Sequence, residues 1–217
     1  MTNDPPRPPD FDDGFRENLA ALFEWRRDVR RFLADPVDLD LIEELLSQAC
    51  LSPSVGNSQP WRFVLVEDTA RRAAIRDNFL KENAAALAAY DEDRGARYAK
   101  LKLAGLDKAP VHLAVFADRS TARGHGLGRR TMPEMLEYSA VAAVNTLWLA
   151  ARAYGIGVGW VSIIDPDDVC KTLEVPEDWR LIAYLCIGYP EAPHREPALQ
   201  RAGWQDRGHL KDFLFRR

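Results

Sequence analysis

The sequence has no apolar run long enough to cross a lipid bilayer. Its longest apolar helical stretch, Ala140–Ala151, is interrupted by Asn145 and is shorter than the roughly 20 residues that a span requires. The first residues, Met1–Asp13, are rich in Pro and Asp and contain no apolar core of a signal peptide. We therefore expect no membrane segment, and a loose N-terminal leader over residues 1–14.

Positive charge is not in excess either. The 217 residues include 29 Lys and Arg against 33 Asp and Glu, a formal net charge of −4. This balance argues against a nucleic-acid-binding protein and against a polybasic membrane anchor. The three cysteines form no Cys-x-x-Cys pair, so we expect buried free thiols in a reducing cytoplasm. The four histidines lack the spacing of metal ligands, and we predict no metal site.

Common nucleotide-binding and hydrolase motifs are missing as well. The pattern Gly155-x-Gly157-x-Gly159 lacks the spacing of a dinucleotide loop, and it follows a predicted helix rather than a strand. The glycine-rich residues 124–128 lack the Lys-Ser/Thr of a P-loop, which favours a mobile loop. No Gly-x-Ser-x-Gly elbow indicates a serine hydrolase.

What the sequence does contain is the pattern of one well-filled domain. At 47% hydrophobic residues the chain can bury a substantial core. Helical and strand patterns are mixed without a repeat or a low-complexity linker, so we predict a single α+β domain over residues 15–217. We expect helices over residues 15–31, 39–49, 69–90, 133–154 and 165–173, and strands over residues 61–66, 111–117, 158–164 and 181–188.

Four arginines lie within six positions, in residues 26–31 (Arg-Arg-Asp-Val-Arg-Arg). On a helix, arginines four positions apart share one face. Like charges this close repel unless an anion meets them, and phosphate is the natural partner of convergent guanidinium groups. The same arginines would keep Asp28 ionised. On this cluster alone, a solvated helix end paired with Glu24 or Asp35 is an equally good interpretation.

A second polar element, Ser-Pro-Ser-Val-Gly-Asn-Ser-Gln-Pro-Trp at residues 52–61, precedes a predicted strand. Its amide and hydroxyl groups suit the edges of a polar heterocycle. Taken alone, however, the segment is better interpreted as a plain helix-to-strand turn.

In combination, these motifs resemble the nitroreductase superfamily of FMN proteins. Four motifs occur in the expected order over nearly the whole chain: the arginine cluster, the polar element at residues 52–61, a Gly-Ile-Gly-Val-Gly-Trp strand entry and a Gly-Tyr-Pro ending. Asp28 stands where common nitroreductases usually carry Ser or Thr, and Trp160–Ile163 stands where they tend to carry a Pro-x-Glu-Gly segment. With residues 98–106, these departures resemble the branch that destroys reduced FMN with oxygen to make 5,6-dimethylbenzimidazole, the lower ligand of vitamin B12.

The resemblance implies an architecture. We expect an α+β nitroreductase-like fold with a central, mainly antiparallel sheet flanked by helices, in an intertwined homodimer with the flavin at the interface. A lid insertion is expected at about residues 90–106 and a C-terminal extension at residues 191–217. Reduced FMN would be the consumed substrate, with molecular oxygen as co-substrate and a separate flavin reductase as supplier, giving 5,6-dimethylbenzimidazole and a sugar phosphate in cobalamin biosynthesis.

The resemblance also implies roles for single residues. Asp28 would be a catalytic, proton-handling carboxylate facing the flavin, and Ser162 would be catalytic near the reactive edge of the ring. Leu101 would belong to the lid, and Arg207 would add a phosphate contact across the dimer. The full set implied to bind FMN is Arg26, Arg27, Asp28, Val29, Arg30, Ser58, Leu101, Ser162 and Arg207.

Two other functions remain open on the sequence. One is a conventional NAD(P)H-dependent FMN nitroreductase or flavin reductase, which recycles its flavin. The other is a non-catalytic module that binds or stores flavin on the same fold.

Overall fold

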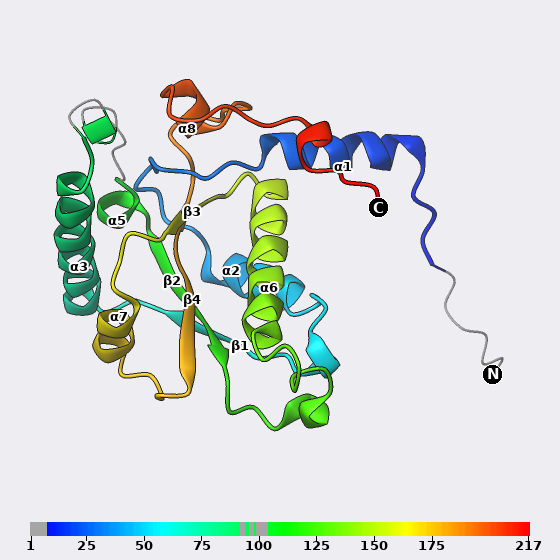
Figure 1. Ribbon diagram of the computed structural model, residues 1–217. Coiled ribbons are helices and arrows are strands. Elements are labelled where there is room, and N and C mark those ends of the chain that lie inside the picture. The colour runs from blue at the N-terminus through cyan, green and yellow to red at the C-terminus, as the bar shows by residue number, and fades with distance from the viewer. Residues whose placement is uncertain (1–7, 92–93, 96–97, 99–103) are drawn as a thin grey trace.

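A four-stranded antiparallel sheet forms the centre of the molecule, with helices on both faces (Figure 1). The computed structural model describes residues 8–91, 94–95, 98 and 104–217. The predicted α+β fold, with an antiparallel sheet flanked by helices, is confirmed. Leu101 and most of the expected lid lie outside the described residues.

The strand order is β1-β2-β4-β3, and every neighbouring pair is antiparallel. The strands are β1 (Trp61–Leu65), β2 (Val111–Asp118), β3 (Gly157–Val161) and β4 (Trp179–Gly188). All eight residues of β2 are buried, as expected for a central strand whose two faces are both covered by helices. β3 forms one edge of the sheet, and this edge positions the site described below.

Two helical layers enclose the sheet. One face is covered by α2 (Leu39–Ala49) and α6 (Met135–Ala153), and the other by α3 (Thr69–Ala88), α5 (Gly105–Lys108) and α7 (Pro166–Leu173) (Figure 1). Each layer closes a separate hydrophobic core. Leu45 and Leu147 belong to the first, and Ile75 and Phe116 to the second.

Local sequence signals account for several helix ends. The side chain of Asp38 accepts a hydrogen bond from the Asp40 amide (2.9 Å), and Asp165 caps α7 through the Asp167 amide (2.9 Å). Gly155 ends α6 with a φ of 76°, a conformation that glycine adopts without steric cost.

Three expectations need correction. The first helix, α1 (Asp13–Trp25), ends six residues early, for a reason given below. The strand expected to reach Ile164 ends at Val161, because the backbone of Asp165 is bonded to the side-chain amide of Asn78 (2.8 and 3.0 Å), which draws the chain toward α3. The three cysteines are free, but only Cys186 is buried: Cys170 is half-buried and Cys50 is exposed.

The remaining elements are short. They are η1 (Val55–Asn57), η2 (Arg123–Gly126), α8 (Ala198–Arg201) and η3 (Leu210–Asp212). α1, α8 and η3 lie together at one end of the molecule (Figure 1). None of the helices within the described ranges is long and apolar enough to cross a bilayer.

Candidate functional site

The arginine cluster lies in an extended segment, not on a helix. α1 ends at Trp25, and Arg26 already has extended backbone angles (φ −71°, ψ 107°). The amide of Val29 donates a hydrogen bond to the carbonyl of Val158 in β3 (3.0 Å), so the segment runs along the edge of the sheet. The prediction that the arginines of residues 26–31 share helical faces is therefore wrong. The chain pairs with an edge strand here instead of forming another helical turn.

Two glycines of β3 let this segment approach closely. A Cβ atom on Gly159 would lie 2.1 Å from the carbonyl oxygen of Val29, and one on Gly157 would lie 2.8 Å from its Cγ2. Any larger residue at Gly159 would push the Val29 backbone away from the sheet. The Gly-Val-Gly pattern of β3 therefore serves close packing of two backbones, which fits the exclusion of a dinucleotide loop.

Asp28 is held at the point where the segment meets β3. Its Oδ1 accepts a hydrogen bond from the amide of Trp160 (2.9 Å), and its Oδ2 lies 3.6 Å from Nε of Arg30. Burial raises the pKa of Asp28, and the Trp160 amide and the charges of Arg30 and Arg26 partly offset that effect. The carboxyl group is thus oriented by the backbone and binds a proton more tightly than a free aspartate.

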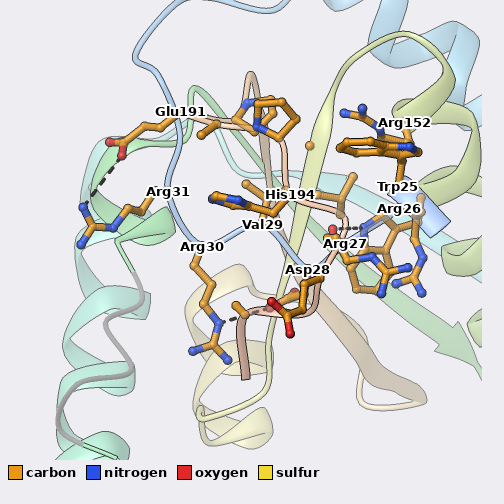
Figure 2. A pocket seen from close by; sticks show the side chains of 18 of the residues that line it. Trp25, Arg26, Arg27, Asp28, Val29, Arg30, Arg31, Arg152, Glu191 and His194 are labelled. Carbon is orange, nitrogen blue, oxygen red and sulfur yellow. Dashed lines mark hydrogen bonds and ion pairs between the residues drawn. The ribbon is translucent and has the colours of Figure 1, made fainter. Parts of the chain in front are cut away.

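A cavity of about 250 Å³ opens between this segment, the C-terminal end of α6 and the tail (Figure 2). Arg26, Arg27 and Arg30 line it, together with Trp148 of α6 and His194 of the tail. Burial is the largest cause of the lowered pKa of both Arg26 and Arg27. The cavity therefore concentrates positive charge in a place where water is partly excluded, which favours an anionic ligand.

The acidic groups nearby do not neutralise all of this charge. Glu24, which the sequence offered as an alternative partner of the cluster, instead forms an ion pair with Arg195 (2.6 Å). Within the cluster, Arg31 pairs with Glu191 of the tail (3.9 Å). Within the described part of the chain, the Nε atoms of Arg27 and Arg30 are buried without a hydrogen-bond partner. Buried donors without acceptors are unfavourable, and an anion in the cavity would supply acceptors.

Ser162 and Arg207 both lie near this segment. Ser162 is exposed and follows the last residue of β3, two positions after the Trp160 whose amide holds Asp28. Arg207, in the tail, is close enough for its charge to lower the pKa of both Arg26 and Arg27. The structure thus brings Arg26, Arg27, Asp28, Val29 and Arg30 together along the cavity. Arg207 lies within electrostatic reach of it, and Ser162 lies two positions beyond the Trp160 amide, but neither is among the residues that line the cavity.

Ser58 lies in a different region. Its loop is held near the start of α6, where the amide of Val55 donates to Oγ of Ser139 (3.0 Å). The arginine segment contacts the other end of α6, where Nε1 of Trp148 donates to the carbonyl of Arg27 (3.3 Å). The two anchor points on the helix, Ser139 and Trp148, are separated by about 13 Å. One chain therefore does not bring Ser58 to the arginines.

The Ser58 loop is tightly constrained. Asn57 and Gln59 have positive φ values of 54° and 46°, which are unusual for residues other than glycine. Ser58 itself is 1% exposed, and among the described residues its Oγ has no hydrogen-bond partner. Gly124 packs against this loop so closely that a Cβ there would lie 2.6 Å from the carbonyl oxygen of Gly56. The glycine-rich segment is a support for the Ser58 loop.

Sequence reasoning missed several contacts of the arginine segment and of the tail. Ala104, at the end of the expected lid, donates its amide to the carbonyl of Arg30 (3.1 Å). Trp204, in the tail, packs against Tyr90 and Tyr98 with ring centroids 5.7 and 6.3 Å away. Trp148 also escaped notice, because an aromatic residue on an apolar helix indicates only a core position.

Comparison with known proteins agrees with this fold. Residues 23–189 match the sequence model of the Nitroreductase family. The match includes the arginine segment, the Ser58 loop and all four strands. The chain belongs to the Nitroreductase family.

Within this family, the chain is similar to several named relatives and to a solved structure. The chain is 58% identical over 199 residues to a 5,6-dimethylbenzimidazole synthase of Rhodospirillum rubrum, which covers 92% of this chain and 94% of the relative. It is 47% identical to a protein of the same name from Rhodobacter capsulatus, over 90% of this chain and 95% of the relative. A solved structure of oxidised iodotyrosine deiodinase bound to FMN and 3-iodo-L-tyrosine superposes with a TM-score of 0.69 at 28% identity, covering 81% and 91% of the two chains.

Proposed function

We propose that this chain acts as a 5,6-dimethylbenzimidazole synthase, which fragments reduced FMN with molecular oxygen to 5,6-dimethylbenzimidazole and a sugar phosphate. The observation that carries the proposal is Asp28, a carboxylate held by a backbone amide beside a cavity lined with arginines. The identity of 58% to a relative of that name supports the same assignment. The product is the lower ligand of vitamin B12, so the reaction belongs to cobalamin biosynthesis.

The residues around the cavity fit a flavin phosphate. Among the described residues, the buried Nε of Arg27 has no acceptor, and that of Arg30 faces only Asp28 Oδ2, at 3.6 Å and beyond hydrogen-bond distance. Phosphate oxygens would provide acceptors for both. Arg26, Arg27 and Arg30 would hold the phosphate and ribityl end, with Arg207 as a further contact. FMN supplies a ring that reacts with oxygen when reduced, and in this reaction it is consumed rather than recycled.

Each catalytic residue would then have a specific task. Asp28 would take a proton at Oδ2, the oxygen beside Arg30, because Oδ1 is already engaged by the Trp160 amide. The hydroxyl of Ser162 orients the reacting edge of the ring by hydrogen bonding.

The position of Ser58 supports a homodimer. For Ser58 and the arginine segment to bind one flavin, the Ser58 loop must come from a second copy of the chain. Exposed apolar side chains on α1 and the tail would be covered in the same assembly: Phe15 is 44%, Phe23 51%, Phe213 69% and Phe215 71% exposed. Both observations support a flavin pocket between two chains.

The supply of reduced flavin and the location of the protein are part of the same proposal. A reaction that consumes reduced FMN needs no nicotinamide site on this chain, so a separate flavin reductase would act as the supplier. The free thiols of Cys50, Cys170 and Cys186 support a reducing compartment, the cytoplasm.

The product assay tests this function. FMN is reduced without oxygen, mixed with the protein, exposed to air, and separated by chromatography. We expect 5,6-dimethylbenzimidazole to accumulate and FMN to disappear. Reoxidation to intact FMN, with neither product nor turnover, would overturn the proposal in favour of a binding or storage module. Repeated oxidation of NADH or NADPH by a nitroaromatic compound, read at the nicotinamide absorbance, would instead indicate a conventional nitroreductase.

A further inference from the structure

Trp148 connects the arginine segment to the rigid body of the protein. It lies near the end of α6, where its ring is partly buried against the first hydrophobic core. Its indole Nε1 donates a hydrogen bond to the carbonyl oxygen of Arg27 (3.3 Å). The guanidinium carbon of Arg26 lies 4.8 Å from the centre of the same ring, a distance at which a cation is attracted to an aromatic face.

The same side chain also contacts the strand that holds Asp28. The rings of Trp148 and Trp160 are 6.2 Å apart with an interplanar angle of 53°. The amide of Trp160 in turn holds the Asp28 carboxylate (2.9 Å). The Trp148 side chain therefore contacts both Arg26 and Trp160, the residue whose amide orients the Asp28 carboxylate.

This contact matters because the arginine segment is held by single backbone bonds to separate parts of the chain, from the Ala104 amide to the Arg30 carbonyl (3.1 Å) and from the Glu191 amide to the Arg31 carbonyl (3.2 Å). It is neither helix nor a full strand, and its backbone pairs with β3 through an isolated bridge at Asp28 and Val158. An arginine side chain that is free to rotate loses considerable conformational entropy when it binds a phosphate. A guanidinium group already held over an indole ring has lost part of that freedom before the ligand arrives.

We propose that Trp148 is a positioning residue that sets the preference of this site for phosphorylated over unphosphorylated flavin. It acts by holding the Arg26 guanidinium over its ring and the Arg27 backbone through its Nε1–H, so that both arginines line the cavity. The Arg27 guanidinium is held in addition by the carbonyl of Phe23, to which its Nη2 donates (2.7 Å). This inference rests on the proposed function, since it takes the cavity to receive the phosphate of FMN.

The test compares the dissociation constants of oxidised FMN and riboflavin, measured by quenching of flavin fluorescence. Trp148→Phe keeps a ring under Arg26 but removes the Nε1–H donor, and should weaken FMN binding about fivefold. Trp148→Leu removes both contacts and should weaken it about tenfold to thirtyfold. Riboflavin, which has no phosphate, should bind each variant within about twofold of the wild type.

Trp179→Phe is the matched control. Trp179 also lies under an arginine, with the Arg62 guanidinium carbon 5.9 Å from its ring, but it is at the far end of the sheet from the cavity. It should leave both dissociation constants unchanged. If the Trp148 variants weaken FMN and riboflavin by the same factor, the residue has only a packing role and the inference is overturned.

Coupling to Arg26 gives a second reading. If Trp148 acts through Arg26, the two substitutions are not independent. The dissociation constant of FMN should then rise by a smaller factor in the Arg26→Ala/Trp148→Leu double variant than the product of the factors for the two single variants. Fully multiplicative effects would contradict the inference. If the wild type binds neither flavin, the proposed function itself is overturned. If the wild type prefers FMN and the Trp148 variants keep the same preference, only this inference is overturned.

Discussion

The backbone amide of Trp160 lies 2.9 Å from Oδ1 of Asp28, and these two residues are 132 positions apart in the chain. The bond fixes one carboxylate oxygen and leaves the other beside Arg30. A strand edge and an arginine-rich segment thus meet at a single oriented carboxyl group.

Asp28→Asn should abolish product formation without abolishing flavin binding. The amide oxygen of asparagine can still accept from Trp160, so the segment stays in place, but the side chain no longer accepts a proton. We expect the rate of 5,6-dimethylbenzimidazole formation to fall at least about 100-fold. Chromatographic product assays and flavin fluorescence measure the two effects. Loss of both together would mean that Asp28 is needed for binding rather than for proton transfer.

The same substitution should stabilise the flavin-free protein at neutral pH. The folded pKa of Asp28 is raised above 3.8, mainly by burial, so the ionised form costs stability once the pH exceeds that value. The variant should therefore have a higher Tm than the wild type at pH 7, and the difference should shrink as the pH falls through the folded pKa. Thermal unfolding across this range measures the effect, and a lower Tm for the variant at pH 7 would contradict it.

The two glycines of β3 should respond differently to substitution. Gly159→Ala forces a Cβ against the Val29 carbonyl, and should destabilise the protein by about 2–3 kcal/mol and abolish product formation. Gly157→Ala meets the Val29 side chain, with Cγ2 at 2.8 Å and Cβ and Cγ1 at 3.2 Å, so the second substitution Val29→Ala, which removes both methyl groups, should relieve most of the clash. Val29→Ala should not rescue Gly159→Ala. Urea unfolding and product assays on the four variants test this, and equal rescue of both glycines would refute the close-packing argument.

Ser58→Ala should weaken flavin binding without destabilising the fold. The buried hydroxyl has no partner in the described chain, so its removal costs no hydrogen bond there. If the hydroxyl binds flavin, its loss should raise the dissociation constant of FMN about threefold to tenfold. Ser139→Ala is the contrasting control, because Ser139 bonds the Val55 amide and its loss should lower Tm. Unchanged flavin binding in Ser58→Ala would remove this residue from the site.

His112 should make the protein sensitive to mild acid. Its Nδ1 lies 2.9 Å from the hydroxyl of Tyr184 inside the sheet, and burial lowers its pKa to about 4. Its contribution to stability is fully present above pH 6.5 and is lost as the pH falls from 6.5 through about 4. Between pH 7.5 and pH 5 we expect a loss of about 2 kcal/mol from this group.

Urea unfolding at the two pH values measures that loss. His112→Phe should be less stable than the wild type at pH 7.5 but should lose less on acidification. His125→Asn, on the exposed η2 turn, should behave as the wild type does. An equal loss in wild type and His112→Phe would assign the acid sensitivity to other groups.

The sequence predicted those features that depend on local chemistry. The predicted helix starts at residues 39 and 165 lie within one residue of those of α2 and α7, because the capping side chains of Asp38 and Asp165 act within a few residues of their own positions. The strands β1 and β2 followed from runs of apolar and β-branched residues. Family resemblance then indicated the arginine segment as part of a site.

Features that depend on distant contacts could not be predicted in this way. The helical pattern of α1 carries no sign that Val158 will pair with Val29, so the helix was extended six residues too far. The support of the Ser58 loop by Gly124 depends on two loops that are far apart in sequence. Trp148 contacts Arg27 across 121 positions, and its own surroundings in the sequence indicate only an apolar helix.

The arginine segment has one more consequence, which concerns solubility. An open strand edge presents unpaired backbone groups and invites other chains to add to the sheet. Here the Val29 amide pairs with Val158 of β3, and the Arg30 carbonyl accepts from Ala104, so the segment shields the β3 edge with charged residues. Substitutions that release this segment would uncover that edge as well as the cavity. Loss of the ligand site and a tendency to aggregate should therefore arise together.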